Sequence, residues 1–321
     1  MRKRIAAFIA FLVPFIILSQ NGLKEVSNFG YNPGNLSLFT YNGNERSFTA
    51  GKPLVIAMHG CAMTADKLCE ITDWNLLALK NDFIVFYPQQ KLINNPSNCF
   101  NWFYESDINR NGECLSIYNM IRYALDSLKA DSTKIFLYGV SAGACMSEVV
   151  SANFPWLINT AAIYAGIPYR AATGSGAVRL LGKTQIKDAK EWGDLVRTQT
   201  PYYKGTYPKM IVLHGTEDFV TDFGYSDEII KQWTNVHQIS DKPVVRDTAF
   251  MNNKKIQRFV YGNKSKPSLI YYKMIGLSHK IAVDIGTNEN EGGKDKLFSE
   301  DIDFFSTYYI AKDFGLIKNG K

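Results

Sequence analysis

The chain has 321 residues, of which 46% are hydrophobic and 21% are charged, and its formal net charge is +6. This balance excludes a disordered or collagen-like chain, and the length is sufficient for a large core without cross-links. Lysine and arginine residues are scattered, and no helical segment carries a basic stripe with interleaved aromatics. We therefore expect a solvated basic surface and no nucleic-acid partner.

The N-terminal segment has the pattern of a secretory signal. Residues 2–4 are basic and are followed by an apolar run over residues 5–18 that is too short for a comfortable membrane span. We expect residues 1–22 to be a signal peptide. An uncleaved anchor is the alternative, since the residues after the run fit a cleavage site poorly. With a signal peptide, we expect the protein to be secreted or periplasmic and to have no stable membrane partner beyond export.

From residue 54 onward, short strand-like runs alternate with helical patterns, which favours a mostly parallel sheet with helices on both faces. We expect strands at residues 54–58, 83–87, 134–138, 160–164, 210–213 and 269–274. The helices are expected near residues 66–80, 114–129, 142–153, 225–236 and 299–313. Residues 36–41, with a possible partner at 46–49, predict an antiparallel edge, and residues 243–262 predict a hairpin. No linker is visible, so residues 23–321 are expected to form one domain.

A candidate nucleophile lies directly between a predicted strand and a predicted helix. Gly139-Val-Ser141-Ala-Gly143 has the GxSxG pattern, in which a sharp turn projects the serine hydroxyl above the sheet. Glycine two positions to either side removes the Cβ atoms that would collide as strand and helix close up. The alternative is a structural glycine-rich turn. The strand before and the helix after favour Ser141 as a nucleophile in an α/β-hydrolase fold.

The chain offers four histidines as the base for this serine. His59 and His214 each follow an apolar strand but come too early for the Ser…Asp…His order of this fold. His237 falls at the end of a charged helical stretch, where we expect it to face solvent. His279 follows the strand at 269–274 and therefore lies at the edge of the sheet where doubly wound proteins bind ligands. His279 is our predicted base.

A carboxylate must orient this histidine and stabilise its charged form. Asp218 lies in the loop after the strand at 210–213 and is our prediction, with Glu217 as a close rival and Asp222 as a distant one. A helix cap is the alternative role for Asp218. For the oxyanion hole, we predict the amide of Ala142 at a helix N-terminus and the amide of Cys61 after the strand at 54–58.

The five cysteines leave at least one thiol unpaired. Cys145 lies in the predicted buried helix and is our candidate for the free thiol. Cys61, Cys69, Cys99 and Cys114 allow three pairings, which remain open at this point. No Cys/His cluster has the spacing of a metal site, so we expect no metal and no cofactor.

Several segments together resemble the extracellular polyhydroxybutyrate depolymerase and feruloyl/acetylxylan esterase family, which consists of α/β-hydrolases of the carbohydrate-esterase type. The matching segments span most of residues 29–280 and are Asn32-Pro-Gly-Asn-Leu, His59-Gly-Cys, Tyr87-Pro-Gln-Gln, Cys99-Phe-Asn-Trp-Phe, Gly112-Glu, Ser116-Ile, Gly139-Val-Ser-Ala-Gly-Ala-Cys-Met, Ala165-Gly-Ile-Pro-Tyr and His214-Gly-Thr-Glu-Asp. Their combination is far more specific than the GxSxG pattern alone.

The resemblance implies a secreted serine esterase with Ser141, His279 and Asp218 as the catalytic triad. It also implies that Cys99, Trp102 and Tyr169 lie around the acyl or alcohol group, and we expect Phe103 of the neighbouring aromatic group to contact substrate as well. The same resemblance favours a Cys61–Cys99 disulfide, which would leave Cys69 and Cys114 as a weaker possible pair.

Three features depart from the family pattern. Met63 stands where the family often has glutamine, and Ser278-His279-Lys280 replaces the usual neighbours of the catalytic histidine. The chain also shows no polymer-binding module. On this basis we expect a feruloyl or acetyl ester of a plant polysaccharide as substrate, with a short polyhydroxyalkanoate oligomer as the alternative. A catalytically silent binding protein and a peptidase of the same fold are weaker alternatives, and the sequence gives no oligomeric state.

Two further patterns have simpler interpretations. Residues 107–112 match the first half of a calcium loop, but Tyr118 occupies the place of the bidentate glutamate. A polar turn that caps the following helix is the better prediction. The aromatic group at residues 100–104 fits either core packing or a wall for a substrate ring.

Overall fold

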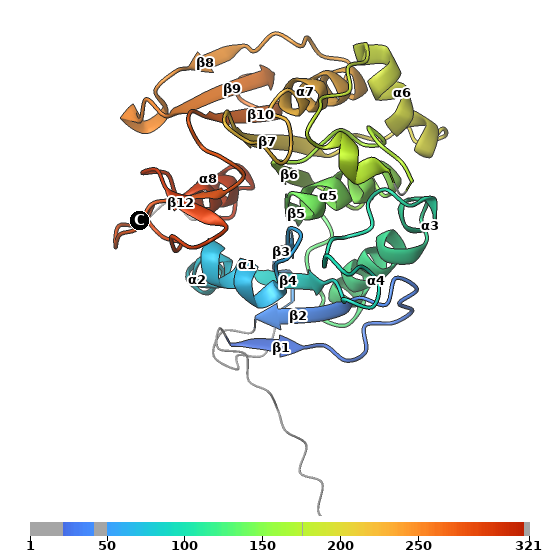
Figure 1. Cartoon of the computed structure of the whole chain (residues 1–321). Coiled ribbons are helices and arrows are strands. Elements are labelled where there is room, and N and C mark those ends of the chain that lie inside the picture. The colour runs from blue at the N-terminus through green and yellow to red at the C-terminus, as the bar shows by residue number, and fades with distance from the viewer. Residues whose placement is uncertain (1–21, 42–49, 175, 318–321) are drawn as a thin grey trace, which may run out of the picture.

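Ten strands form one sheet in the computed structural model, which describes residues 22–41, 50–174 and 176–317 (Figure 1). In spatial order they are β1 (Leu23–Glu25), β2 (Ser37–Tyr41), β4 (Ile84–Gln89), β3 (Leu54–Met58), β5 (Ile135–Val140), β6 (Thr160–Tyr164), β7 (Lys209–Gly215), β10 (Pro267–Met274), β9 (Ile256–Gly262) and β8 (Val245–Asp247). The strands from β4 to β10 are parallel, whereas β1 and β2 at one edge and β9 and β8 at the other are antiparallel.

The register of the central strands brings their carboxyl ends to one edge of the sheet. Met58 of β3 pairs with Gly139 of β5, and Val140 of β5 pairs with Tyr164 of β6. Further along, Gly215 of β7 pairs with Met274 of β10. The loops that follow β3, β5, β7 and β10 therefore begin side by side, although they are far apart in sequence.

Helices cover both faces of the sheet, as the alternation of strand side chains requires. Ile56 of β3 faces the core that also contains buried residues of α4 (Gly112–Asp126), α5 (Ala142–Asn153), α6 (Ala189–Gln199) and α7 (Tyr225–Val236). Its neighbour Val55 faces α1 (Ala65–Thr72), α2 (Trp74–Asn81) and α8 (Ser306–Asp313) on the other side. These two cores confirm the predicted α/β class with helices on both faces.

All six strands predicted from residue 54 onward and three helices match the observed elements to within a few residues, while two predicted helices differ. The helix predicted at 66–80 is two helices, because Asp73 adopts a left-handed conformation with φ 51° and its carboxylate accepts a hydrogen bond from the amide of Gly293. The predicted helix at 299–313 begins only at Ser306. Its first part is strand β12 (Ser299–Asp301), which pairs with β11 (Ile281–Val283).

Some elements were absent from the predictions. Helix α6 begins with a capping box formed by Asp188 and Glu191, a signal that was present in the sequence. Strand β1, the short helix α3 (Glu105–Ile108) and the 3-10 helices η2 (Ala177–Leu180) and η3 (Phe250–Asn252) were also not predicted. The predicted hairpin is formed by β8 and β9.

Two predictions fall on parts of the chain that are not described. The signal peptide at residues 1–22 lies outside the described residues except for Gly22, and so does the possible strand at 46–49. Within the described ranges, no helix has both the length and the apolar character that a bilayer span requires.

Candidate active site

Ser141 occupies a tight turn between β5 and α5. Its backbone is strained, with φ 55° and ψ −118°, as expected for a serine that is held out from the end of a strand. A Cβ added at Gly139 would lie 2.2 Å from the Gly143 carbonyl oxygen, and one added at Gly143 would lie 2.3 Å from the Met58 carbonyl oxygen. Gly139 therefore allows β5 to pack closely against α5, and Gly143 allows α5 to pack closely against the end of β3.

His279 and Asp218 meet at the ends of the neighbouring strands β10 and β7. The Nδ1 atom of His279 lies 2.7 Å from Oδ2 of Asp218, and the other carboxylate oxygen accepts hydrogen bonds from the amides of Val220 and Thr221. Burial acts to raise the pKa of Asp218, but hydrogen bonds from His214 and His279 outweigh it and hold the pKa well below its usual range. Asp218 is therefore a carboxylate that fixes the Nδ1–H tautomer of His279.

Ser141 Oγ has no hydrogen-bond partner among the described residues, so its link to the His279 ring stays a prediction. Hydrogen bonds between catalytic groups are often long before substrate binds, so this geometry does not argue against the pair.

The remaining histidines are buried or half-buried and have structural contacts. His214 donates from Nε2 toward Asp218 Oδ2 at 3.2 Å and toward the Thr221 carbonyl at 3.0 Å, a contact that sequence reasoning missed. The sequence signal for this contact was the short spacing between His214 at the end of β7 and Asp218 in the loop that follows. The prediction that His237 faces solvent is wrong: it is half-buried and its Nε2 contacts the carbonyl of Pro208, which the turn after α7 brings within 3.0 Å.

The residues of the two predicted oxyanion donors, Cys61 and Ala142, line the same cavity as Ser141. Among the described residues, neither the amide of Cys61 nor that of Ala142 has a hydrogen-bond acceptor, so both remain available to a ligand. The backbone between β3 and Cys61 lies against the serine, since a Cβ added at Gly60 would be 3.3 Å from Ser141 Cβ.

The cysteines partly follow the expectations. Cys61 and Cys99 form a disulfide, as the resemblance implied, and Cys145 is a buried free thiol. The weaker Cys69–Cys114 pairing is wrong, because both thiols are free. Cys69 packs on the face covered by α1 and Cys114 on the face covered by α4, so the sheet separates them.

A small apolar cavity opens beside the nucleophile. Its volume is about 20 Å³, which is room for about one water molecule. Trp102 and Phe103 line it, as do Val178 and Leu181 from the segment around η2; the other lining residues are Cys61, Cys99, Ser141, Ala142, Cys145 and Thr221. Tyr169 is not among them: it is buried and its hydroxyl donates to Gln199.

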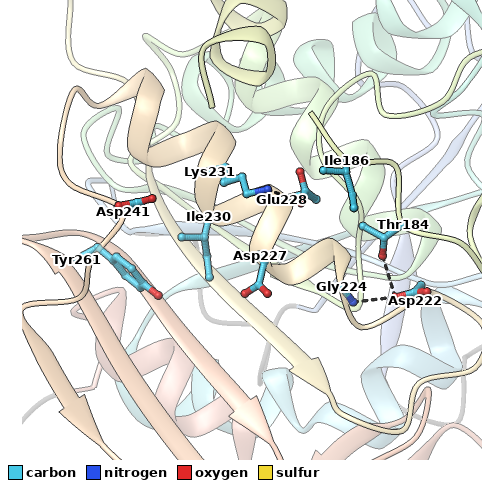
Figure 2. A pocket seen from close by; sticks show the side chains of 10 residues that line it. All are labelled: Thr184, Ile186, Asp222, Gly224, Asp227, Glu228, Ile230, Lys231, Asp241 and Tyr261. Carbon is cyan, nitrogen blue, oxygen red and sulfur yellow. Dashed lines mark hydrogen bonds and ion pairs between the residues drawn. The ribbon is translucent and has the colours of Figure 1, made fainter. Parts of the chain in front are cut away.

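A larger cavity of about 520 Å³ lies along α7 and shares no lining residue with the first. Figure 2 shows its acidic side chains, among them Asp222, Asp227 and Asp241, with Asp222 held by hydrogen bonds from Thr184 and from the Gly224 amide. Its lining includes no histidine and no serine, whereas Ser141 lines the smaller cavity.

Potential metal ligands are sparse in the described ranges. The single group with suitable geometry consists of the carboxylates of Asp284, Asp301 and Asp303, whose ligand atoms lie within 4.8 Å of one another. None of these residues lines the cavity beside Ser141. The calcium-like loop instead caps α4, since Asp107 accepts a hydrogen bond from the amide of Glu113.

Comparison with known proteins identifies the family of this chain. The family model described as esterase PHB depolymerase matches residues 41–253. The chain is 37% identical to poly(3-hydroxyalkanoate) depolymerase C of Paucimonas lemoignei, over 96% of this chain and 74% of that protein. It is 30% identical to feruloyl esterase B of Talaromyces funiculosus, over 86% of this chain and 78% of that protein.

Among solved structures, the fold is similar to that of an acetyl xylan esterase from Aspergillus awamori, with a TM-score of 0.73 and 24% identity over 80% of this chain and 93% of that one. This likeness supports the α/β-hydrolase fold. The family match and the 37% identity reported above lead to one conclusion: the chain belongs to the esterase PHB depolymerase family.

Proposed function

We propose that this chain, a carboxylic ester hydrolase, acts through an acyl-enzyme on Ser141. The serine oxygen bonds to the ester carbonyl carbon while its proton passes to Nε2 of His279. The amides of Cys61 and Ala142 hold the negative carbonyl oxygen of the tetrahedral intermediate. The intermediate collapses as the bond to the alcohol breaks, and His279 protonates the leaving alcohol. In the second half of the reaction, His279 removes a proton from water, which attacks the acyl carbon. The bond to the Ser141 oxygen then breaks, the serine takes back its proton from His279, and the acid is released.

The observation that carries this proposal is the pairing of His279 with Asp218 at 2.7 Å at the sheet edge where Ser141 also lies. The tautomer that this hydrogen bond fixes leaves Nε2 of His279 as a proton acceptor. Removal of the serine proton requires such an acceptor.

The cavity beside Ser141 supports a short acyl group. With about 20 Å³ it has room for a group of about the size of a methyl, whereas a feruloyl ring requires some of the lining side chains to move. We therefore propose an acetyl ester of a plant polysaccharide as the first substrate, ahead of a feruloyl ester. A polyhydroxyalkanoate oligomer is the second candidate, because the 37% identity to the depolymerase of Paucimonas lemoignei covers nearly the whole chain.

We further propose that the protein is exported. The disulfide between Cys61 and Cys99 supports an oxidising compartment, and the basic and apolar segments at residues 2–18 support a signal peptide.

The test is turnover of acetylated xylan, methyl ferulate and a hydroxybutyrate trimer by the full chain and by Ser141→Ala. We expect the highest kcat/KM on the acetyl ester and loss of all hydrolysis in the variant. A fluorophosphonate should label the parent and not the variant, because only an activated serine reacts. Retained turnover by a folded Ser141→Ala variant, or no labelling of the parent, would contradict the mechanism.

A further inference from the structure

Behind the oxyanion loop lies a buried polar network that the catalytic chemistry does not use directly. Its members are His59 at the end of β3, Gln90 after β4, Asn101 in the loop that carries the aromatic wall, and Glu113 in the first turn of α4. All four side chains are buried. They come from four of the segments by which the family was recognised.

His59 connects the oxyanion loop to the end of β4. Its Nε2 lies 3.1 Å from the amide of Gln90, which can only donate, so Nε2 accepts and Nδ1 carries the hydrogen. The Nδ1–H group then donates to the Gly60 carbonyl at 2.8 Å, directly before Cys61. Burial lowers the pKa of His59 to about 4, so the ring stays neutral and keeps this tautomer near neutral pH.

Glu113 is the centre of the network. Its Oε1 accepts from the side-chain amides of Gln90 and Asn101, and its Oε2 accepts from the Asn101 backbone amide at 2.7 Å. The same Gln90 amide also donates to the Cys99 carbonyl at 3.0 Å. Cys99 in turn is joined to Cys61 by the disulfide. The contacts therefore close a ring that runs from the oxyanion loop through Glu113 and back.

The carboxylate is costly where it lies. Burial raises the pKa of Glu113 to about 8, and the Asp107 carboxylate adds to this effect, although hydrogen bonds from Asn101 and Gln90 favour the ionised form. Every polar partner of the two oxygens is a donor, so the two oxygens satisfy all three contacts only as acceptors. A glutamine side chain in the same place cannot accept all three hydrogen bonds, because in either orientation its NH2 group would face another N–H group.

We propose that Glu113 is a positioning residue that holds the Cys61 amide and the Trp102–Phe103 wall in the geometry needed for the reaction. Its two carboxyl oxygens accept the hydrogen bonds that hold Gln90 and Asn101, and these in turn hold the disulfide-linked loops. This inference rests on the proposed function, since it assigns the Cys61 amide to the oxyanion hole.

The test compares Glu113→Gln with Glu148→Gln in the full chain. Glu148 is the matched control: it is also buried, burial also raises its pKa to about 8, and among the described residues its side chain accepts a hydrogen bond from Trp233, outside the network. On a p-nitrophenyl acetate substrate, with active serine counted by fluorophosphonate titration, we expect kcat of Glu113→Gln to fall by about tenfold or more. KM should change by less than about threefold, and Glu148→Gln should keep its kcat.

A purely structural role would lower the unfolding midpoint and the titrated fraction but leave kcat per active serine unchanged, and that result would overturn the inference. If Glu113→Gln does not fold, Asn101→Ala decides instead, because it removes one side-chain contact to Glu113 and keeps the backbone one. It should lower kcat in the same direction by a smaller factor, and an unchanged kcat would overturn the inference. Failure of the proposed function is distinct, since it appears as hydrolysis by Ser141→Ala.

Discussion

Removal of the Cys61–Cys99 disulfide tests both the stability of the fold and the role of the oxyanion loop. The bridge joins residues separated by 38 positions. Closing a loop of that length lowers the entropy of the unfolded chain by an amount worth about 4 kcal/mol at room temperature. We therefore expect the double variant Cys61→Ser, Cys99→Ser to lose about 4 kcal/mol of unfolding free energy, measured by urea denaturation with tryptophan fluorescence.

Activity should fall as well, because the Cys61 amide then depends on the polar network alone. Loss of a whole oxyanion donor lowers kcat by about 10²–10³-fold, so a loosened donor should cost about tenfold at saturating p-nitrophenyl acetate. The parent protein treated with a reductant is the control, since Cys69, Cys114 and Cys145 are already free thiols. A stability loss below about 1 kcal/mol with an unchanged denaturant slope would refute the loop-entropy argument.

Three further changes are predicted. Asp218→Asn should lower kcat by about 10³–10⁴-fold in a folded protein, because an amide no longer fixes the tautomer of His279; a loss below tenfold would contradict the triad. Gly143→Ala should lower the unfolding free energy by about 1–3 kcal/mol and reduce activity, since the added Cβ meets the Met58 carbonyl at 2.3 Å; unchanged denaturation would contradict that packing. The free energy of unfolding of the Glu148→Gln variant should increasingly exceed that of the parent as pH rises from about 4.5 to 8. In that window the native state keeps a proton that the unfolded chain releases, so the parent loses up to ~1.4 kcal/mol per pH unit relative to the variant. Parallel stability curves for parent and variant would count against the raised pKa.

The sheet was predictable because its strands are locally marked. Residues 54–58 and 160–164 are apolar runs bounded by polar segments, and both match the observed strands to the residue. The helix predicted at 66–80 was less accurate because its break depends on Asp73, whose left-handed conformation is fixed by a contact with Gly293, far away in sequence. A local pattern cannot carry such a contact.

The candidate site also contains residues that local sequence patterns reveal and contacts that form only when the chain folds. Ser141 was identified from its neighbours in sequence, and His279 and Asp218 from their places after strands. The contact of His214 with Asp218 and the network around Glu113 depend on side chains that meet only after folding. Tyr169 illustrates the converse, since the resemblance suggested a substrate contact and the fold buries it beside Gln199.

Helix α5 has no solvent-facing side, because all twelve of its residues are buried. Most substitutions there will disturb packing on several sides at once. By contrast, Val178 and Leu181 reach the cavity from a 3-10 helix and its end, and Val178 is also partly open to solvent. Directed evolution toward bulkier acyl groups should therefore diversify these two positions and leave the helix behind the nucleophile unchanged.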